Sequence, residues 1–391
     1  MTAKTLRPSF DAAIELVFEN VATLGSENVP LEYACGRVPS AALSAKRSSP
    51  PYNMSAMDGY AICQTDIDRH NLCFEAGPEI FAGAQIMPEM RAGIAFPIST
   101  GARVPPGCGT VVLKERAERC GGRVRLSAPP ERGRNIRREA EDAQLGDVIL
   151  RPGQLLTPAA VGALASFGIT EIELFRKPRA ALLITGDEVD AQLCDANGPA
   201  ISAALMQRQI AITRKCRVPD DRCTLRQEIN SLLSDGAADL IISTGGVSIG
   251  PRDYILDVLK ELGAVIHFHG VAMRPGKPVL FATLPGGLPY FGLPGNPVAA
   301  LVGFRFFVST GLRKMQGLPV EQGTYFDLNL DGRKDLTVVL KASAKLGDAP
   351  VILAGQESHK MLPLIGSNCW IAVTDTGGLR TTRHFPLNAR F

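Results

Sequence analysis

Chemically distinctive side chains are concentrated in four loops, each of which follows an apolar run of the sequence. The first loop places two adjacent carboxylates, Asp187 and Glu188, directly after Thr185 and Gly186. Carboxylate oxygens are the ligands that hard cations such as Mg²⁺ prefer, and Mg²⁺ usually keeps several of its waters. The pair therefore predicts a Mg²⁺ site.

The second loop is rich in glycine and hydroxyl groups, and a helix is predicted directly after it, over 251–262. Its candidate residues are Ser243, Thr244, Gly245, Gly246 and Ser248. Glycines let the backbone approach a ligand closely, and a helix N-terminus offers free N–H groups to an anion. Phosphate binding is the functional interpretation, and a purely structural turn is the alternative. Neither a GxxxxGK[ST] loop nor a GxGxxG fingerprint occurs here, which argues against the common nucleotide hydrolases and dehydrogenases.

Two further loops carry cations and helix-capping residues. Arg274 and Lys277 flank a Pro-Gly turn that Pro278 follows, an arrangement suited to holding an oxyanion between two charges, although a surface turn would look the same. In the fourth loop, a helix cap or a second anion-facing helix end is expected. The candidate residues of the fourth loop are Pro294, Asn296 and Pro297.

The four loops lie within a segment in which predicted strands and helices alternate regularly. Between residues 178 and 317, short apolar strands alternate with helical patterns, which is typical of βαβ units on a largely parallel sheet with helices on both faces. Such a sheet gathers ligands beyond the carboxyl ends of its strands. His267 and His269 share one face of a predicted strand, where packing or a place beside a phosphate is favoured over a zinc site, which needs more ligands.

The remaining segments predict three smaller domains around this α/β core. A length of 391 residues corresponds to two to four domains at about 150 residues each. We expect a multidomain α/β protein with a helical linker domain, an inserted β-rich domain, the α/β domain and a small terminal β-domain. In that order, the predicted domains are 1–47 with 140–177, 48–139, 178–317 and 318–391.

Composition limits the classes of partner. The net charge of +3 is too small to favour nucleic-acid binding, and 45% apolar residues indicate a folded rather than a disordered chain. The nine cysteines are scattered without a CxxC pair, which favours free thiols in a reducing cytoplasm. No secretion signal or membrane span is expected, because the apolar stretch 297–312 is short and contains Arg305.

Taken together, the motifs resemble those of the molybdopterin molybdenumtransferase family, which includes the bacterial enzymes of molybdenum cofactor synthesis and the E-domain of gephyrin. The resemblance spans most of the chain, and its seven motifs occur in the family's order. They are Pro50 to Ala61, Thr100 to Ala102 with Val104-Pro105, Glu141-Asp142, Thr185 to Glu188, Ser243 to Asp253, Pro275 to Pro278, and Gly292 to Pro297.

The resemblance implies an elongated homodimer in which the cleft of each α/β domain is completed by the partner's second domain. It implies insertion of molybdate into adenylylated molybdopterin, with release of AMP and formation of molybdenum cofactor, assisted by Mg²⁺; the attacking oxygen would come from water or from molybdate. It also implies contact with a molybdopterin adenylyltransferase and with acceptor apoenzymes. The alternatives are a non-catalytic paralogue that carries molybdopterin or molybdenum cofactor, and a protein-interaction scaffold.

Residue roles follow from the resemblance position by position. The glycine-rich loop would cradle the pterin phosphate or its adenylyl partner, Arg274 and Lys277 would clamp molybdate, and Asp187 with Glu188 would hold a cation or water. The expected catalytic residues, of which the first three would come from the partner, are Asp58, Thr100, Asp142, Glu188 and Asp253. The expected binding residues are Thr185, Gly186, Ser243, Thr244, Gly245, Gly246, Ser248, Arg274, Lys277, Pro278, Pro294, Asn296, Pro297 and Ser358.

The chain departs from the family pattern around the oxyanion. Arg274 stands where many members carry Lys, so a planar guanidinium group replaces a compact ammonium group. Lys341 stands where an Arg that contacts molybdate is expected, and the run from Gln356 to His359 only approximates the family's Gln-Gly-Ser-Gly. These differences predict an altered molybdate affinity or an altered choice of oxyanion.

Overall fold

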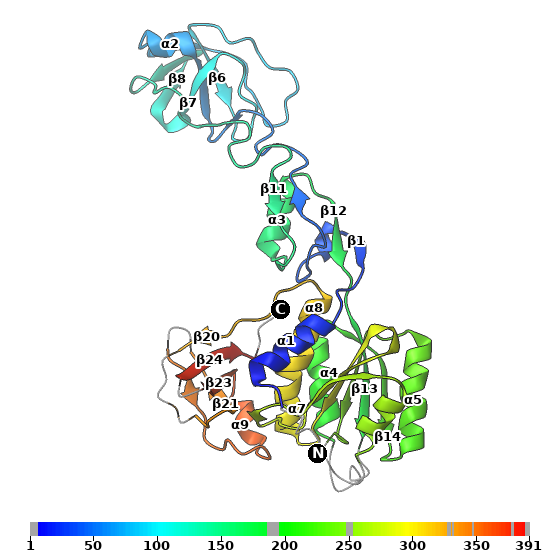
Figure 1. The fold of residues 1–391 in the computed structure, drawn as a ribbon. Helices are drawn as coiled ribbons and strands as arrows, with labels where there is room; N and C mark the ends of the chain where they lie inside the picture. Colours follow the sequence, from blue (N-terminus) through cyan, green and yellow to red (C-terminus); the bar gives the residue numbers. More distant parts are fainter. Residues whose placement is uncertain are drawn as a thin grey trace.

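The molecule is elongated, with its domains strung along one axis (Figure 1). The computed structural model describes residues 7–185, 195–247, 253–326, 330, 332–345, 348–376 and 379–387. A β-rich domain lies at one end, a slender linker lies in the middle, and the α/β domain with the C-terminal domain beside it forms the other end. No helix in the described segments is long and apolar enough to cross a membrane.

The β-rich domain is built on one six-stranded sheet. The strand order is β7-β4-β6-β5-β9-β8, and the β8–β9 hairpin at the edge carries Arg119, Arg123 and Arg125. The elements are β3 (Met54–Ser55), β4 (Gly59–Cys63), α2 (Gln64–Asp68), β5 (Cys73–Ala76), β6 (Ile94–Ile98), β7 (Cys108–Leu113), η2 (Lys114–Arg116), β8 (Ala117–Cys120), β9 (Arg123–Leu126) and β10 (Ile136–Arg137).

Two small antiparallel ladders form the linker. One pairs β1 with β12 and the other pairs β2 with β11. Thr157 caps α3 by accepting a hydrogen bond from the Ala160 N–H at 3.1 Å. The elements are β1 (Ser26–Pro30), η1 (Leu31–Tyr33), β2 (Leu43–Ser44), β11 (Val148–Leu150), α3 (Pro158–Ser166) and β12 (Glu171–Phe175).

The α/β domain has a mixed six-stranded sheet of order β14-β13-β15-β19-β18-β16. The first four strands of that order are mutually parallel, and β18 runs antiparallel to both of its neighbours. The strands are β13 (Arg179–Thr185), β14 (Ala211–Val218), β15 (Leu240–Thr244), β16 (Val265–His269), β18 (Leu280–Leu284) and β19 (Leu288–Leu293), with the turn η3 (Pro285–Gly287) between the last two.

Helices cover both faces of this sheet. One face packs against α4 (Asn197–Gln207) and the continuous helical run α7 (Pro297–Gly303), η4 (Phe304–Val308) and α8 (Ser309–Met315). The other face packs against α5 (Arg222–Asp235) and α6 (Ile255–Glu261). The mostly parallel sheet with helices on both faces is the architecture that the alternating pattern predicts.

Two helices differ from their expected places. The helix predicted from Pro251 begins only at Ile255, which is its first buried residue. The preceding residue, Tyr254, makes no capping hydrogen bond with its side chain. The helix α1 (Phe10–Asn20), which the sequence groups with the linker, packs its buried Phe10 and Val17 into the core of the α/β domain. Burial of this apolar stripe stabilises α1 at the far end of the linker.

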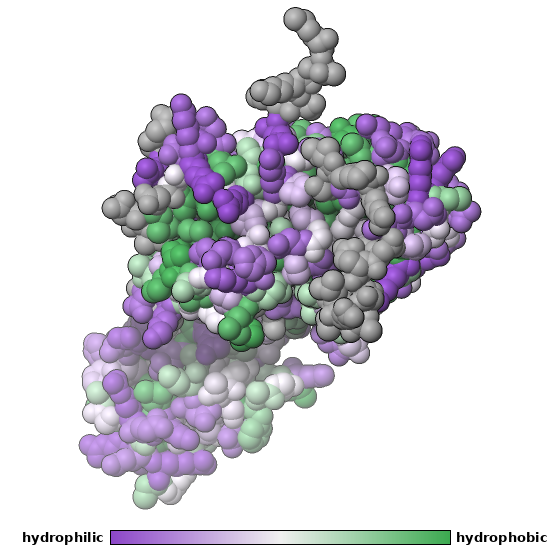
Figure 2. All heavy atoms as spheres, turned by 90° about the horizontal axis from the view of Figure 1, so that it is seen from below, coloured by the Kyte–Doolittle hydropathy of each residue, from purple (hydrophilic) through white to green (hydrophobic). Residues whose placement is uncertain are grey.

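The C-terminal domain shares a sheet with the α/β domain. Its strand order is β17-β21-β23-β24-β20, and β17 comes from the α/β segment of the chain, between β16 and β18. The elements are β17 (Met273–Arg274), β20 (Thr324–Tyr325), β21 (Thr337–Ser343), β22 (Val351–Ile352), α9 (Leu362–Ile365), β23 (Cys369–Thr376) and β24 (Leu379–Pro386). In the view from below (Figure 2), apolar surface gathers on the side of this domain, where α9 exposes Leu362 and Ile365.

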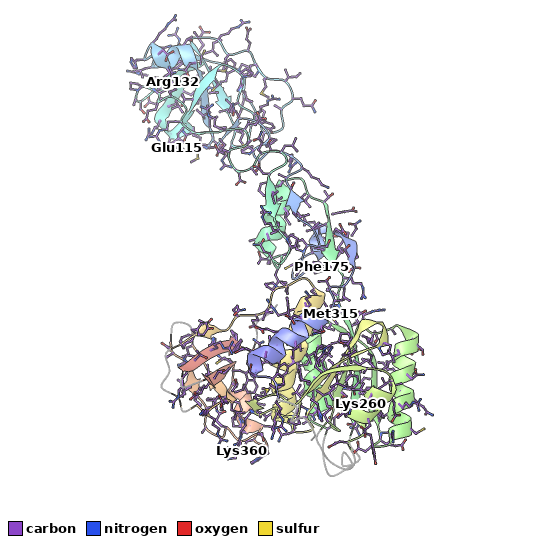
Figure 3. The ribbon with its side chains drawn as sticks, viewed as in Figure 1. Glu115, Arg132, Phe175, Lys260, Met315 and Lys360 are labelled. Atoms are coloured by element: carbon purple, nitrogen blue, oxygen red, sulfur yellow. The ribbon has the colours of Figure 1, made fainter. Side chains whose placement is uncertain are left out.

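Ion pairs hold the junction between linker and α/β domain, where Phe175 and Met315 are labelled (Figure 3). Arg176 makes a two-pronged ion pair with Asp239, at 2.6 and 2.7 Å, and Arg179 adds a third contact at 2.8 Å through its backbone N–H. Burial alone would raise the pKa of Asp239, but hydrogen bonds from Arg176 and Arg179 hold it below its ordinary value. The charged cluster therefore stays ionised at neutral pH and stiffens the junction.

Candidate functional site

Two central strands end side by side at the predicted glycine-rich loop. Thr185 at the end of β13 is buried, and its hydroxyl donates to the carbonyl oxygen of Thr244 at the end of β15, at 3.1 Å. The hydroxyl of Thr244 is itself buried without a hydrogen-bond partner in the described structure. Ser243 is fully buried in β15, and its hydroxyl, like that of Tyr290, has no hydrogen-bond partner in the described structure.

The loop depends on two glycines with left-handed backbone. Gly245 has φ of +91° and Gly246 has φ of +61°, a region that other residues rarely enter. A Cβ on Gly245 would lie 2.6 Å from the carbonyl oxygen of Thr185, which is backbone and cannot move aside. A Cβ on Gly246 would lie 3.1 Å from the end of the Ile255 side chain, which is a longer approach and one to a side chain instead of the backbone. The predicted residues Gly186, Asp187, Glu188 and Ser248 lie outside the described residues.

This difference gives a matched pair of variants. Gly245→Ala is expected to displace the loop and to lower the turnover of the substrate about a hundredfold, because a shift of about 1 Å at a positioned ligand has effects of that size. Gly246→Ala is expected to cause a clearly smaller loss. Turnover and thermal unfolding of both variants would check this. Equal activity of the two variants would contradict the proposed contact with Thr185.

His269 holds the far end of the same loop. Its Nε2 lies 2.7 Å from the carbonyl oxygen of Val247, so this nitrogen carries the proton and donates. His267 instead stacks on Phe281 and contacts the Thr283 hydroxyl at 2.7 Å, and burial lowers its pKa. No group of three or more metal-binding side chains occurs in the described parts of the chain. The stacking of His267 and the hydrogen bonds of both rings to protein groups fit the packing interpretation.

The cations of the third loop line a cavity of about 500 Å³. Several predicted residues meet there, from three separate parts of the chain, namely Arg274, Lys277, Pro278, Pro294, Asn296 and Ser358. Arg7 adds a further cation, and none of the described lining residues is acidic. Arg7, Arg274 and Lys277 have no ion-pair partner among the described residues. Unpaired cations in a cleft that is otherwise largely apolar favour an anionic ligand.

Arg7 is a lining residue that sequence patterns do not find. Ser9 bridges Ala272, and the Ala272 N–H donates to the carbonyl oxygen of Pro8 at 3.0 Å, so the segment before α1 runs alongside the cleft. Gly270 leaves space for the Arg7 side chain, since a Cβ there would lie 3.0 Å from its Nε. No local motif marks Arg7, because its place depends on pairing between segments about 260 residues apart.

A second cavity of about 450 Å³ adjoins the first on the side of the C-terminal domain. The two share Arg274, Pro275 and Ser358 in their lining. Asn296 caps α7 as predicted, accepting from the Ala299 N–H at 3.4 Å, while its amide group donates to the Ser358 hydroxyl at 3.4 Å. The cap residue thus links the start of α7 to the C-terminal domain across the cleft.

The residues expected from the second domain lie elsewhere in this chain. Asp58 accepts hydrogen bonds from the Thr100 backbone N–H at 2.7 Å and from the Thr100 hydroxyl at 2.9 Å. These bonds, helped by Lys114, lower the pKa of Asp58. Asp142 contacts the Ser49 hydroxyl at 3.4 Å. Asp58 directly precedes β4 and Thr100 closely follows β6 of the β-rich domain, which lies at the opposite end of the molecule from the α/β domain (Figure 1). Asp142 lies between β10 and β11, and Asp253 lies two residues before α6 in the α/β domain.

The fold and these cavities define a multidomain α/β protein with a cleft lined by cations beside the carboxyl ends of its parallel strands. Residues 8–168 match the family model "MoeA N-terminal region (domain I and II)", and residues 181–314 match "Probable molybdopterin binding domain". The chain is 33% identical over 356 residues to a molybdopterin molybdenumtransferase of Nostoc sp., covering 85% of this chain and 81% of that protein. It is 31% identical over 371 residues to one of Haemophilus influenzae, covering 90% and 91%. This chain therefore belongs to the molybdopterin molybdenumtransferase family.

Solved structures support the fold independently. The structure of a molybdopterin biosynthesis MoeA protein from Pyrococcus horikoshii superposes with a TM-score of 0.80, covering 97% of this chain and 98% of that one, at 23% sequence identity. The expected multidomain α/β fold and the expected family are thus confirmed.

Proposed function

We propose that this protein inserts molybdate into adenylylated molybdopterin, releasing AMP and forming molybdenum cofactor. The observation that carries the proposal is the cleft lined by Arg7, Arg274 and Lys277, with no acidic residue among its described lining. Molybdate is a dianion and the adenylylated substrate carries phosphates, so both match this charge. Membership of a family of transferases supports catalysis over simple carriage.

The cleft residues act by binding and electrostatic stabilisation. Arg274 and Lys277 stand on either side of a Pro-Gly turn, so an oxyanion between them meets two positive charges. The glycine-rich loop at Gly245 presents backbone close to the phosphates of the substrate. Breaking the phosphoanhydride builds negative charge on the departing AMP, and preorganised cations lower the energy of that state.

Mg²⁺ is the metal we propose for this reaction. When bound, it would supply further positive charge to the phosphates. Its expected ligands, Asp187 and Glu188, lie outside the described residues, and the proposal rests on the preference of Mg²⁺ for carboxylate oxygens.

We also propose a cytoplasmic setting, which the free thiols at exposed Cys35, Cys73 and Cys223 support. The proposed protein partners are a molybdopterin adenylyltransferase, which would supply the adenylylated substrate, and acceptor apoenzymes, which would receive the molybdenum cofactor.

We further propose that a second copy of the chain completes each cleft. In one chain, Asp58 and Thr100 belong to the β-rich domain at one end of the molecule, whereas Arg274 of β17 lies beside the α/β domain at the other end (Figure 1), so the two groups require different subunits to meet. Surface around Asp58 suits a contact, because Met57 is 47% exposed and Phe81 is 57% exposed.

The test measures release of AMP from adenylylated molybdopterin. Release by the native protein is expected to require both molybdate and Mg²⁺, and to fall about a hundredfold or more in Lys277→Ala, since loss of one stabilising charge has effects of that size. Omission of each ion in turn, with AMP quantified by chromatography, checks the requirement. Tight binding of the substrate without any release of AMP would overturn catalysis in favour of the carrier alternative.

A further inference from the structure

Two cysteines face each other across neighbouring strands of the β-rich domain. Cys63 is the last residue of β4, Cys108 is the first residue of β7, and the two are direct partners in the antiparallel register. They also share one face of the sheet, because Cys63 follows Ala61 by two positions and Cys108 packs in the apolar cluster that contains Ala61. Among the described residues, no other strand pair joins two cysteines.

The local backbone brings the two side chains close together. A register shift after Ile62 leaves Gly109 without a partner, and a Cβ there would lie 2.9 Å from the backbone Cα of Gln64, so a glycine is needed for this approach. The next pair is hydrogen-bonded, since the Gln64 N–H donates to the carbonyl oxygen of Gly107 at 3.1 Å. Bonded and non-bonded pairs alternate in an antiparallel ladder, so the cysteines occupy a non-bonded pair, where opposite Cα atoms are about 4.5 Å apart. Disulfide bonds span Cα separations of about 4.4–6.8 Å.

Both side chains are free thiols at the ends of their strands. The Cys108 thiol donates to the carbonyl oxygen of Thr110 at 3.1 Å, and the Cys63 sulfur lies 3.2 Å from the Thr65 hydroxyl. Burial raises the pKa of Cys108 to about 11, and the charge of a Cys63 thiolate acts in the same direction, which places the two sulfurs near each other. Because the thiolate is the reactive form, the pair reacts slowly at neutral pH.

We propose that Cys63 and Cys108 form a disulfide bond when the protein meets a peroxide, and that this bond fastens β4 to β7. One thiolate attacks an oxygen of hydrogen peroxide and becomes a sulfenic acid, while the other oxygen leaves as hydroxide. The second thiolate attacks the sulfur of the sulfenic acid, which forms the S–S bond and expels a second hydroxide. The two thiol protons and the two hydroxide ions combine to water, so the pair of thiols loses two electrons to the peroxide.

The bond ties the ladder at the end opposite to Asp58. Asp58 precedes β4 and Lys114 follows β7, and the carbonyl oxygen of Asp58 accepts a hydrogen bond from the Lys114 N–H at 3.2 Å. A disulfide between residues 63 and 108 closes a long loop of the unfolded chain, which stabilises the folded domain. It also withholds both sulfurs from irreversible oxidation to sulfinic and sulfonic acids. Neither cysteine belongs to the proposed site, so the inference stands apart from the proposed function.

Peptide mapping of the full-length protein after treatment with hydrogen peroxide tests the bond. Blocking of free thiols with iodoacetamide and digestion without reductant are expected to yield a linked pair of peptides that contain Cys63 and Cys108, and a thiol reductant is expected to separate them. Cys63→Ala and Cys108→Ala are each expected to abolish the linked pair. Cys73→Ala is the matched control, because it removes an exposed cysteine of the same domain, and it is expected to retain the pair. Thermal unfolding of the three variants verifies that they fold.

Hydrogen exchange measures the consequence for the two strands. Backbone amides of β4 and β7 are expected to exchange at least about tenfold more slowly in the oxidised protein than in the reduced protein, and peroxide is expected to cause no slowing in Cys63→Ala. Absence of the linked pair while the exposed Cys73 and Cys120 become oxidised would overturn the proposal. So would equal amounts of links from Cys63 or Cys108 to those two cysteines, since such links require an unfolded domain. Unchanged exchange in the linked protein would contradict the fastening of the strands.

Discussion

Replacing Arg305 by leucine is expected to lower the free energy of unfolding of the C-terminal domain by about 2–4 kcal/mol. Arg305 is buried in η4, and its two terminal nitrogens each lie 2.7 Å from an oxygen of Glu321, while one also donates to the carbonyl oxygen of Pro386 at 3.1 Å. Removing one partner of a buried ion pair leaves the other charge without compensation. Glu321 keeps some contact with water, which places the effect around and somewhat below the lower end of the usual range of about 3–5 kcal/mol.

The single tryptophan provides a local probe for this measurement. Trp370 is buried in β23 within the same core as η4, so the urea dependence of its fluorescence reports unfolding at this contact. The matched control is Lys360→Leu, which removes the cation of a half-exposed ion pair with Glu357 in the same domain. Exposed pairs contribute about 0.2–1 kcal/mol, and the control is expected to shift the transition little.

A double variant tests the physical reason. If the unpaired charge of Glu321 causes the loss, then Arg305→Leu combined with Glu321→Leu is expected to be more stable than Arg305→Leu alone. A double variant that is less stable than the single one would show that Arg305 acts mainly through its packing against Phe306 and Phe385 instead.

Local signals predict the parts of this fold that depend on neighbouring residues. Thr157 and Asn296 are recognisable as N-caps from sequence, and both accept the expected backbone hydrogen bonds. The parallel strands of the α/β domain appear as buried apolar runs between helical patterns, because both of their faces are covered. Because these runs mark where each strand ends, the loops at the carboxyl ends of the strands can be selected as candidate sites from the sequence alone.

Contacts between distant segments could not be predicted in this way. The strand β17 is only two residues long and pairs with β21, more than 60 positions later, so no periodicity reveals that it joins the two domains. The same pairing brings Arg333 to the cleft. The environment of Lys341 was equally hidden, because a lysine in a strand gives no sign that its ammonium is buried on two backbone carbonyls. The family resemblance draws attention to Lys341, and the structure shows where its ammonium group lies.

The location of the cleft explains why the molecule needs several domains. Arg274 and Lys277 belong to the α/β domain, Ser358 and Arg333 belong to the C-terminal domain, and Arg7 precedes α1. These positively charged side chains repel one another when no ligand lies between them. Rigid parts of the fold are therefore needed to hold them in place. The shared sheet at β17 and the buried pair of Arg305 with Glu321 provide such supports on the two sides of the junction.

Mixing two inactive variants is expected to restore AMP release if each cleft is shared between two subunits. Asp58→Ala and Lys277→Ala each remove one charge that the proposal assigns to the same composite site, so each homodimer would be strongly impaired. In a mixed dimer, the intact Lys277 of one subunit meets the intact Asp58 of the other, which gives one native site of two. Random exchange makes half of the dimers mixed, so about a quarter of all sites would be native.

The experiment co-expresses the two variants with different affinity tags and measures AMP release after sequential purification on both tags. The expected activity of the purified mixed dimer is about half that of the native protein per subunit, because one site of two is complete. Two copies of Asp58→Ala with different tags serve as the control and are expected to stay inactive. Mixed dimers no more active than the average of the two single variants would contradict the shared cleft. They would mean that Asp58 and Lys277 act within one chain or in separate sites.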